Sequence, residues 1–114
     1  MNSNNFDKEK KKLKTLFKEK KFLDLLKNGT KLLEEAPDDI QIINILGITS
    51  INTQNFNEAE KYFKKLLLIK KSPDNYYTLG NIQKKLNKFH EAVISFENAI
   101  KMNPHFSEAH NNLG

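Results

Sequence analysis

The sequence predicts an all-α fold built from antiparallel helix pairs, and three observations support this class. Apolar residues recur at helical spacing along most of the chain, and short turn-forming stretches separate the apolar runs. Gly47, Gly80 and Gly114 follow one another at an almost constant interval. Ala92 follows Ala59 at the same interval, which we call one repeat. A fixed period of this kind is typical of helical repeat arrays, whereas an ordinary helical bundle has no need of one.

The first predicted pair joins a helix over residues 6–20 to a helix over 22–35, and residues 1–5 are expected to lie outside it. This pair matches the repeat least well, because Leu25 stands where alanine recurs and Gly29 stands where an aromatic residue is expected. We expect the second helix to continue through Gly29, at a cost of up to about 1 kcal/mol relative to alanine. A break at this glycine is the alternative. The residues expected to be buried are Leu13, Leu16, Phe17, Phe22, Leu25, Leu26, Leu32 and Leu33.

The second predicted pair spans residues 40–52 and 57–70. Pro37 lies in the turn 36–39 before it, and this turn also provides a cap for the first helix. That helix is apolar nearly all round, so we expect neighbours to cover it on several sides. The inward-facing residues expected on its partner helix are Ala59, Phe63, Leu66, Leu67 and Ile69.

The third predicted pair begins at Ser72 and Pro73, because serine caps free N–H groups and proline suits the first helical turn. Asn87 and Lys88 interrupt the apolar pattern, and Pro104 ends the second helix. Gly80 faces small residues on that second helix, which predicts a close approach of the two backbones. The residues expected on the inner face of the second helix are Phe89, Ala92, Val93, Phe96, Ala99 and Ile100.

These residues resemble the tetratricopeptide repeat. Its pattern W-x2-L-G-x2-Y…A-x3-F…P falls on Tyr76, Leu79, Gly80, Gln83, Ala92, Phe96 and Pro104, with Tyr76 in place of tryptophan and Gln83 in place of the aromatic residue. The resemblance implies a right-handed superhelix of antiparallel helix pairs. We expect one domain over 1–114: a degenerate repeat 6–38, repeats 39–72 and 73–106, and the truncated first helix of a fourth repeat over 107–114. This last stretch favours a fragment of a longer protein over a terminal cap.

Composition limits the classes of function. The chain has 114 residues, a net charge of +5 and no cysteine, so no disulfide framework or thiolate metal site is available. Residues 1–21 carry eight lysines and three acids, and 8 − 3 accounts for the whole excess of +5. No arginine is present, and a coding bias toward A and T explains this together with the abundant lysine, asparagine and isoleucine. The N-terminus has no signal-peptide pattern and no run is apolar enough for a membrane span, so we expect a cytoplasmic protein without membrane contact.

The sequence contains no motif typical of a catalytic or metal-binding site. No catalytic constellation and no glycine-rich phosphate loop occur. His105 and His110 are poorly spaced for a metal pair, since they lie beside a turn that contains proline. We therefore expect no catalytic residue, no cofactor and no metal.

The resemblance implies a binding groove lined by the first helix of each pair, which takes peptides or partner proteins. Ile45 and Ile48 would be apolar anchors in it, flanked by Tyr77. A basic stripe of Lys10, Lys14 and Lys18 beside them would suit acidic flanks. The alternatives are that curvature of the array buries the two isoleucines and that the lysines form a solvated face. Transfer of the groove positions gives the candidate residues Lys10, Lys14, Lys18, Asn44, Ile45, Ile48, Tyr77, Asn81, Lys84 and Asn112.

Two subtypes of the family can be compared with these positions. Only Lys10 fits the carboxylate clamp of chaperone-binding members. Asn112 matches the asparagine ladder of repeats of the O-linked N-acetylglucosamine transferase type, and one repeat together with the short C-terminal stretch looks like those bacterial arrays.

We therefore expect a non-catalytic protein–protein interaction scaffold. One alternative is the repeat region of a larger enzyme, such as a glycosyl- or sulfotransferase. RNA binding is disfavoured, since arginine is absent and aromatic residues for stacking are few. Homodimer formation through the truncated C-terminal helix is a further alternative.

Overall fold

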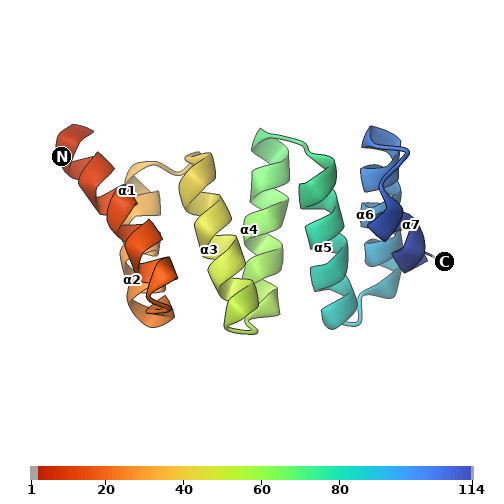
Figure 1. Ribbon diagram of the computed structural model, residues 1–114, viewed down its shortest axis with the longest axis horizontal. Helices are drawn as coiled ribbons and strands as arrows, with labels where there is room; N and C mark the ends of the chain where they lie inside the picture. The colour runs from red at the N-terminus through yellow and green to blue at the C-terminus, as the bar shows by residue number, and fades with distance from the viewer. Residues whose placement is uncertain (1–2, 114) are drawn as a thin grey trace.

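The computed structural model describes residues 3–113, which form an all-α chain without a strand. The helices of this range are α1 (Ser3–Lys18), α2 (Phe22–Glu35), α3 (Ile40–Asn52), α4 (Phe56–Ile69), α5 (Pro73–Lys85), α6 (Phe89–Met102) and α7 (Ser107–Leu113). They stand side by side in one row that measures 47 × 24 × 21 Å (Figure 1). The predicted array of antiparallel helix pairs is confirmed.

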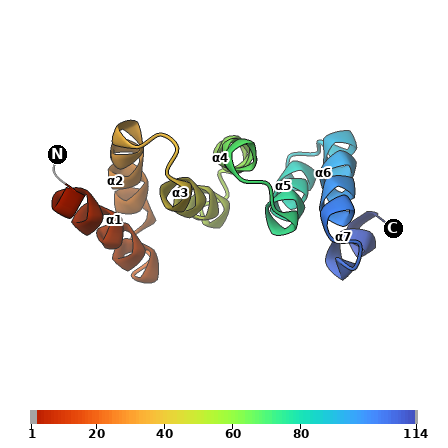
Figure 2. The same ribbon diagram turned by 90° about the horizontal axis from the view of Figure 1, so that it is seen from above.

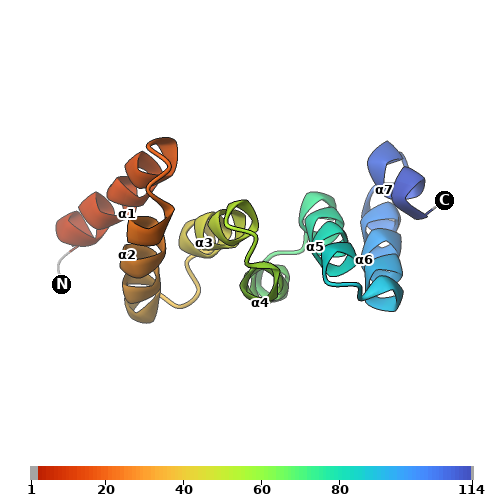
Figure 3. The same ribbon diagram turned by 90° about the horizontal axis from the view of Figure 1, so that it is seen from below.

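The row is curved. Seen from above, α1, α3, α5 and α7 lie along the inner side of the curve and α2, α4 and α6 along the outer side (Figure 2). The view from below shows the same division (Figure 3). We call the side formed by α1, α3, α5 and α7 the concave face.

The turns within the three pairs share one backbone geometry. Lys20, Gln54 and Asn87 have φ values of 59°, 60° and 62°, in the left-handed region. The residue after each donates its N–H to a carbonyl of the preceding helix: Lys21 to Leu16 at 2.9 Å, Asn55 to Ser50 at 2.8 Å and Lys88 to Gln83 at 2.8 Å. This is the hydrogen bond of the Schellman helix end. The same turn conformation and hydrogen bond therefore recur at the interval of the sequence repeat.

Two of the helix starts follow from their capping residues. The Asp39 carboxylate accepts the Ile42 N–H at 3.1 Å, and the Ser72 hydroxyl accepts the Asn75 N–H at 3.1 Å. Pro73 occupies the first turn of α5. Each cap contributes about 1 kcal/mol to helix stability. Both predicted caps are confirmed.

Glycine allows the second and third pairs to close tightly. A methyl group built on Gly80 would lie 2.6 Å from the Phe96 ring, and one on Gly47 would lie 2.8 Å from the Phe63 ring. Both distances are too short for real Cβ contacts. The phenylalanine rings of α4 and α6 therefore pack directly on the backbones of α3 and α5. The lack of room beside Gly80 is as predicted, but the group that it faces is the Phe96 ring and not the small residues expected there.

The first pair packs in a different way. The second helix continues through Gly29, which confirms the unbroken helix. A methyl group on Gly29 would lie 2.7 Å from Cδ2 of Leu46, which belongs to α3 of the next pair. The buried side chains that α1 and α2 contribute to the N-terminal core are the leucines Leu13, Leu16, Leu25 and Leu32.

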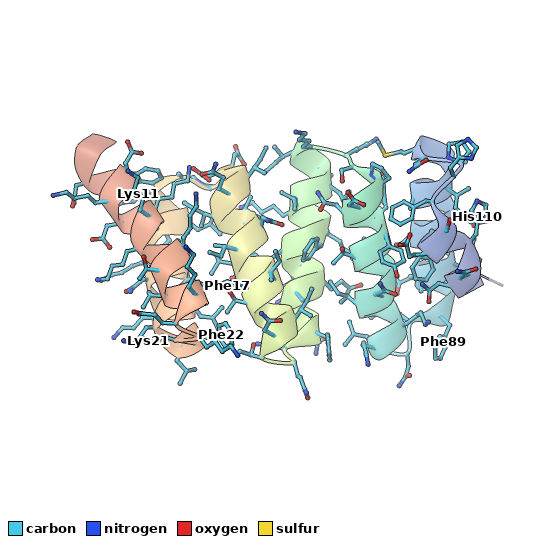
Figure 4. All side chains as sticks on the ribbon, in the orientation of Figure 1. Lys11, Phe17, Lys21, Phe22, Phe89 and His110 are labelled. Atoms are coloured by element: carbon cyan, nitrogen blue, oxygen red, sulfur yellow. The ribbon has the colours of Figure 1, made fainter. Side chains whose placement is uncertain are left out.

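Some burial predictions are wrong. Ile69, Phe89 and Val93 were expected to face inward, but their exposed fractions are 38%, 60% and 44%. Ile69 is the last residue of α4, at the rim of its pair. Phe89 lies on the first turn of α6, away from α7 (Figure 4). Neither Phe89 nor Val93 belongs to the buried cluster of Ala92, Phe96, Ala99, Phe106 and Ala109 that joins α6 to α7.

The helix ends differ slightly from the predicted ones. Helix α1 begins at Ser3 rather than at residue 6, so residues 3–5 are helical. Helix α4 begins and ends one residue earlier than predicted. Residues 1, 2 and 114 lie outside the described part of the chain, and so does the expectation that Gly114 is a packing glycine. Over residues 3–113, no helix is both long and apolar enough to cross a membrane.

Candidate partner-binding face

The predicted groove residues all lie on helices of the concave face, but they form separate clusters. One cluster lies between α1 and α3, and a second joins α5 to α7. A cleft between α3 and α5 separates the two.

In the first cluster, Lys10 is paired with a carboxylate of its own chain. Its Nζ lies 2.8 Å from Oδ2 of Asp39, and only 22% and 15% of the two side chains are exposed. Burial disfavours the charged carboxylate, but the hydrogen bonds from Lys10 and from the Ile42 N–H hold the pKa of Asp39 below its ordinary value. Lys10 therefore ties α1 to the start of α3, which the sequence reading missed.

The neighbouring lysines are available. Lys14 and Lys18 are exposed, and neither forms an ion pair within the described residues. Lys14 lines a cleft of about 190 Å³ between α1 and α3, together with Asp7, Lys10, Lys11 and Gln41, so that three lysines and one carboxylate meet there. Ile45 lies at a small adjoining hollow that Lys14 and Gln41 also line. A basic surface beside one apolar side chain results.

In the second cluster, Asn112 connects α7 to α5. Its Oδ1 accepts a hydrogen bond from Lys84 Nζ at 2.8 Å, and its Nδ2 donates to the Tyr77 hydroxyl at 3.3 Å. The same Nδ2 donates to the Glu108 carbonyl at 2.9 Å. The Tyr77 ring stacks on Phe106, with 5.1 Å between the ring centroids. Tyr77 therefore packs toward α6 and α7, on the side of α5 away from Ile45.

The remaining candidate groove residues, on α3 and α5, each have different surroundings. Asn81 lines the cleft between α3 and α5. Ile48 is half-buried against the central core, Ile45 is half-buried against the N-terminal core, and Asn44 is half-buried on α3. Both isoleucines are thus partly covered by core residues, and Ile45 in addition lines the hollow beside Lys14.

A buried polar network is a further feature that the sequence reading missed. Gln83 donates to Glu60 Oε2 at 3.3 Å and accepts from the Ser95 hydroxyl at 2.6 Å. Lys88 Nζ contacts Glu60 Oε1 at 2.7 Å, and Lys64 lies 3.5 Å from Oε2. The one available signal was Gln83 itself, a polar residue where the repeat pattern has an aromatic one.

The charge of Glu60 is stabilised within this network. Burial raises its pKa, but the hydrogen bonds from Lys88 and Gln83 and the charge of Lys64 outweigh burial, so that the pKa lies below its ordinary value. The hydrogen bond to Glu60 raises the pKa of Lys88 in turn. The network joins α4, α5 and α6 across the junction of two pairs, and it is structural in character.

The acidic and histidine side chains of the described chain form no arrangement suited to a metal ion. Over residues 3–113, no group of three or more such side chains has a geometry that could hold a metal ion. His110 instead lies with Nε2 at 2.9 Å from the Pro104 carbonyl. Figure 4 shows it on α7, at the C-terminal end of the row.

Comparisons with known proteins agree with this architecture. Two family models described as tetratricopeptide repeat match residues 40–73 and 73–106. No curated protein sequence matches the chain significantly.

Several solved structures are similar in fold. A crystal structure of MamA superposes with a TM-score of 0.88 at 20% identity, over 95% of this chain and 60% of that chain. The first TPR of Spaghetti (RPAP3), bound to the HSP90 peptide SRMEEVD, gives 0.82 at 22% identity, over 99% and 90%. A mutant of the Thermobaculum terrenum O-GlcNAc transferase gives 0.75 at 17% identity, over 97% of this chain and 22% of that chain.

This chain thus spans 60% of the length of the MamA chain. At these identities the neighbours establish the fold alone. The repeat models, the common turn geometry and the glycine–phenylalanine contacts lead to one assignment. The chain belongs to the tetratricopeptide repeat family.

Proposed function

We propose that the concave face binds a segment of a partner protein, and that the chain is a non-catalytic interaction module. Tetratricopeptide repeats typically mediate protein–protein interaction. The observation that carries the proposal is the surface between α1 and α3, where Lys14 lies beside the half-exposed Ile45. An apolar anchor beside cationic side chains suits a segment with an apolar residue and acidic flanks.

The lysines define the preferred charge of the partner. Lys14 and Lys18 form no ion pair within the described residues, and Asp7 is the one acidic residue among three lysines in the cleft that Lys14 lines, so a carboxylate of the partner would meet an excess of positive charge. The peptide SRMEEVD in the RPAP3 structure also carries acidic residues. Since only Lys10 matches the carboxylate clamp of chaperone-binding members, we do not assign that peptide to this chain.

We propose that the repeats are 6–38, 39–72 and 73–106 and that 107–114 begins a fourth, as part of a longer array. The exposed patch on α6 supports this. Phe89 stands one repeat after Phe56, and Val93 stands one repeat after Glu60. Phe56 packs against the core that includes Ile82 of α5, and Glu60 is bonded to α5, whereas Phe89 and Val93 have no such cover. A full-length first helix of the fourth repeat, of which α7 is the first half, would cover Phe89 and Val93. Association of two chains through α7 is the alternative.

A second candidate is the repeat region of a larger enzyme. The similarity to the O-GlcNAc transferase favours it to this extent: a fold like this one forms 22% of that longer chain. The length of the parent open reading frame distinguishes this candidate from a free-standing scaffold.

The test is a pull-down from lysate with identification of bound proteins by mass spectrometry. The variant Lys14→Glu/Lys18→Glu should lose the partner, because it reverses the charge beside Ile45 while both side chains are exposed. Binding to the unaltered chain should also weaken as salt is raised.

The matched control is Lys27→Glu/Lys31→Glu, which makes the same charge change at the same spacing on α2. This control should retain the partner. A partner that both variants retain, or that both lose, would contradict the assignment of the concave face between α1 and α3.

A further inference from the structure

A second feature of the concave face is a cleft of about 200 Å³ between α3, the start of α4 and α5. Its lining is Ile51, Phe56, Thr78, Asn81, Ile82 and Lys85. Three of these residues are apolar, and Ile82 is buried at 2% exposure. The volume equals that of roughly six or seven water molecules. One side chain of a partner can occupy such a space.

The residues that line the cleft differ in size from those at the equivalent positions of the preceding repeat. Phe17 stands one repeat before Ile51, and it contacts Phe22 with 5.8 Å between the ring centroids. Ile45 and Ile48 stand one repeat before Thr78 and Asn81. Three lining positions thus carry smaller side chains than their equivalents, whereas Ile82 and Lys85 are larger than their equivalents Thr49 and Asn52.

The face of α5 explains which side chains surround the cleft. Thr78, Ile82 and Lys85 follow one another at helical spacing and so share one face of α5. Tyr77 and Lys84 are bonded to Asn112 of α7 and are engaged there. Lys85 is exposed and forms no ion pair within the described residues. The cleft thus combines an apolar interior with one free positive charge.

We propose that this cleft receives one aliphatic side chain of a partner segment in which a neighbouring residue is acidic. The proposal rests on the proposed function, since it names a subsite of the same concave face. The aliphatic group would displace water from Ile51, Phe56 and Ile82, and the carboxylate would meet Lys85. A neutral polar segment lacks both features and would bind poorly.

The test uses NMR on this chain with labelled isoleucine methyl groups and backbone amides. Three acetylated and amidated tripeptides are titrated: Asp-Leu-Asp, Asn-Leu-Asn and Asp-Ser-Asp. The first should shift the methyl signals of Ile51 and Ile82 and the amide of Lys85 saturably. The second should bind at least threefold more weakly, and the third should not saturate.

Two variants sharpen the result. Lys85→Glu should weaken Asp-Leu-Asp at least threefold, whereas Lys101→Glu, the same charge change at an exposed site of α6, should not. Thr78→Ile/Asn81→Ile reproduces the side chains found on α3 and should abolish the shifts of Ile51. An unchanged melting temperature of each variant verifies that the fold is retained.

The opposite outcomes are equally clear. Equal binding of all three tripeptides, or no saturable shift at Ile51, would overturn the proposal. Shifts that depend on protein concentration without peptide would assign the cleft to a second copy of the chain. Shifts confined to Lys14, Lys18 and Ile45 would overturn this subsite while leaving the proposed function in place.

Discussion

In both the first and the third helix pair, two antiparallel helices pack against each other, but the small and large residues are distributed in opposite ways. In α5–α6, Gly80 lies under the Phe96 ring and the two helices pack closely. In α1–α2, leucines fill the pair and the glycine, Gly29, faces Leu46 of the next pair.

The consequence is visible in the shape of the pairs. Helices α1 and α2 diverge toward the start of α1 (Figure 2). A polar crevice of about 420 Å³ opens there, lined by residues that include Asn5, Glu9, Lys31 and Glu35. Close approach of two helices thus requires a position without a side chain, and leucine at that position holds the pair apart.

The largest expected effect on stability comes from placing a side chain at the glycine position of the third pair. Gly80→Trp forces an indole into the space of Phe96, and we expect a loss of about 3 kcal/mol or more in the free energy of unfolding. The melting temperature followed by circular dichroism should fall by roughly 10 to 20 °C.

The control lies on the first helix of the first pair. Leu13 stands there at the position equivalent to the glycine, and its neighbour Lys14 is exposed. Lys14→Trp should therefore change stability by no more than about 0.5 kcal/mol. If both tryptophan variants melt alike, the space at Gly80 is not closed by Phe96 as described.

The second effect concerns the junctions that join the pairs. At the α4–α5 junction Glu60 and Gln83 form a buried polar network, whereas the equivalent positions at the α2–α3 junction hold Leu26 and Ser50. Glu60→Gln should cost about 1 to 3 kcal/mol at pH 7, because the charged hydrogen bond to Lys88 is lost.

The pH dependence has a definite sign. The folded-state pKa of Glu60 lies below the ordinary value of 4.5, so its contribution is present above about pH 4.5 and is lost as the pH falls through the lower folded pKa. Urea unfolding at pH 7 and pH 3 should therefore show a smaller difference between Glu60→Gln and the unaltered chain at pH 3. Glu97→Gln, an exposed control on α6, should show no such change, and equal differences at both pH values would exclude Glu60 as the source.

The smallest effect comes from the turns. Lys20 and Asn87 adopt the same left-handed conformation, which asparagine tolerates better than lysine. Lys20→Asn should raise the free energy of unfolding by about 0.5 to 1 kcal/mol, and Asn87→Lys should lower it by a similar amount. Urea midpoints measure both. Changes of the same sign in the two variants would contradict the shared turn geometry.

The sequence by itself determined the all-α class, the period, the caps at Asp39 and Ser72, and the contact between Gly80 and the second helix of its pair. Each depends on local rules, such as helical spacing, capping chemistry and side-chain size, which act between residues close in the chain. The groove positions followed from the family pattern, and their role in binding stays a prediction.

Only the tertiary structure decided how those positions are used. It paired Lys10 with Asp39, bonded Asn112 to Lys84, buried Gln83 beside Glu60 and left Phe89 exposed. These outcomes depend on which residues from different helix pairs come within hydrogen-bond or packing distance. Those distances depend on how all the helices pack along the row, so they cannot be predicted from any one segment of the sequence.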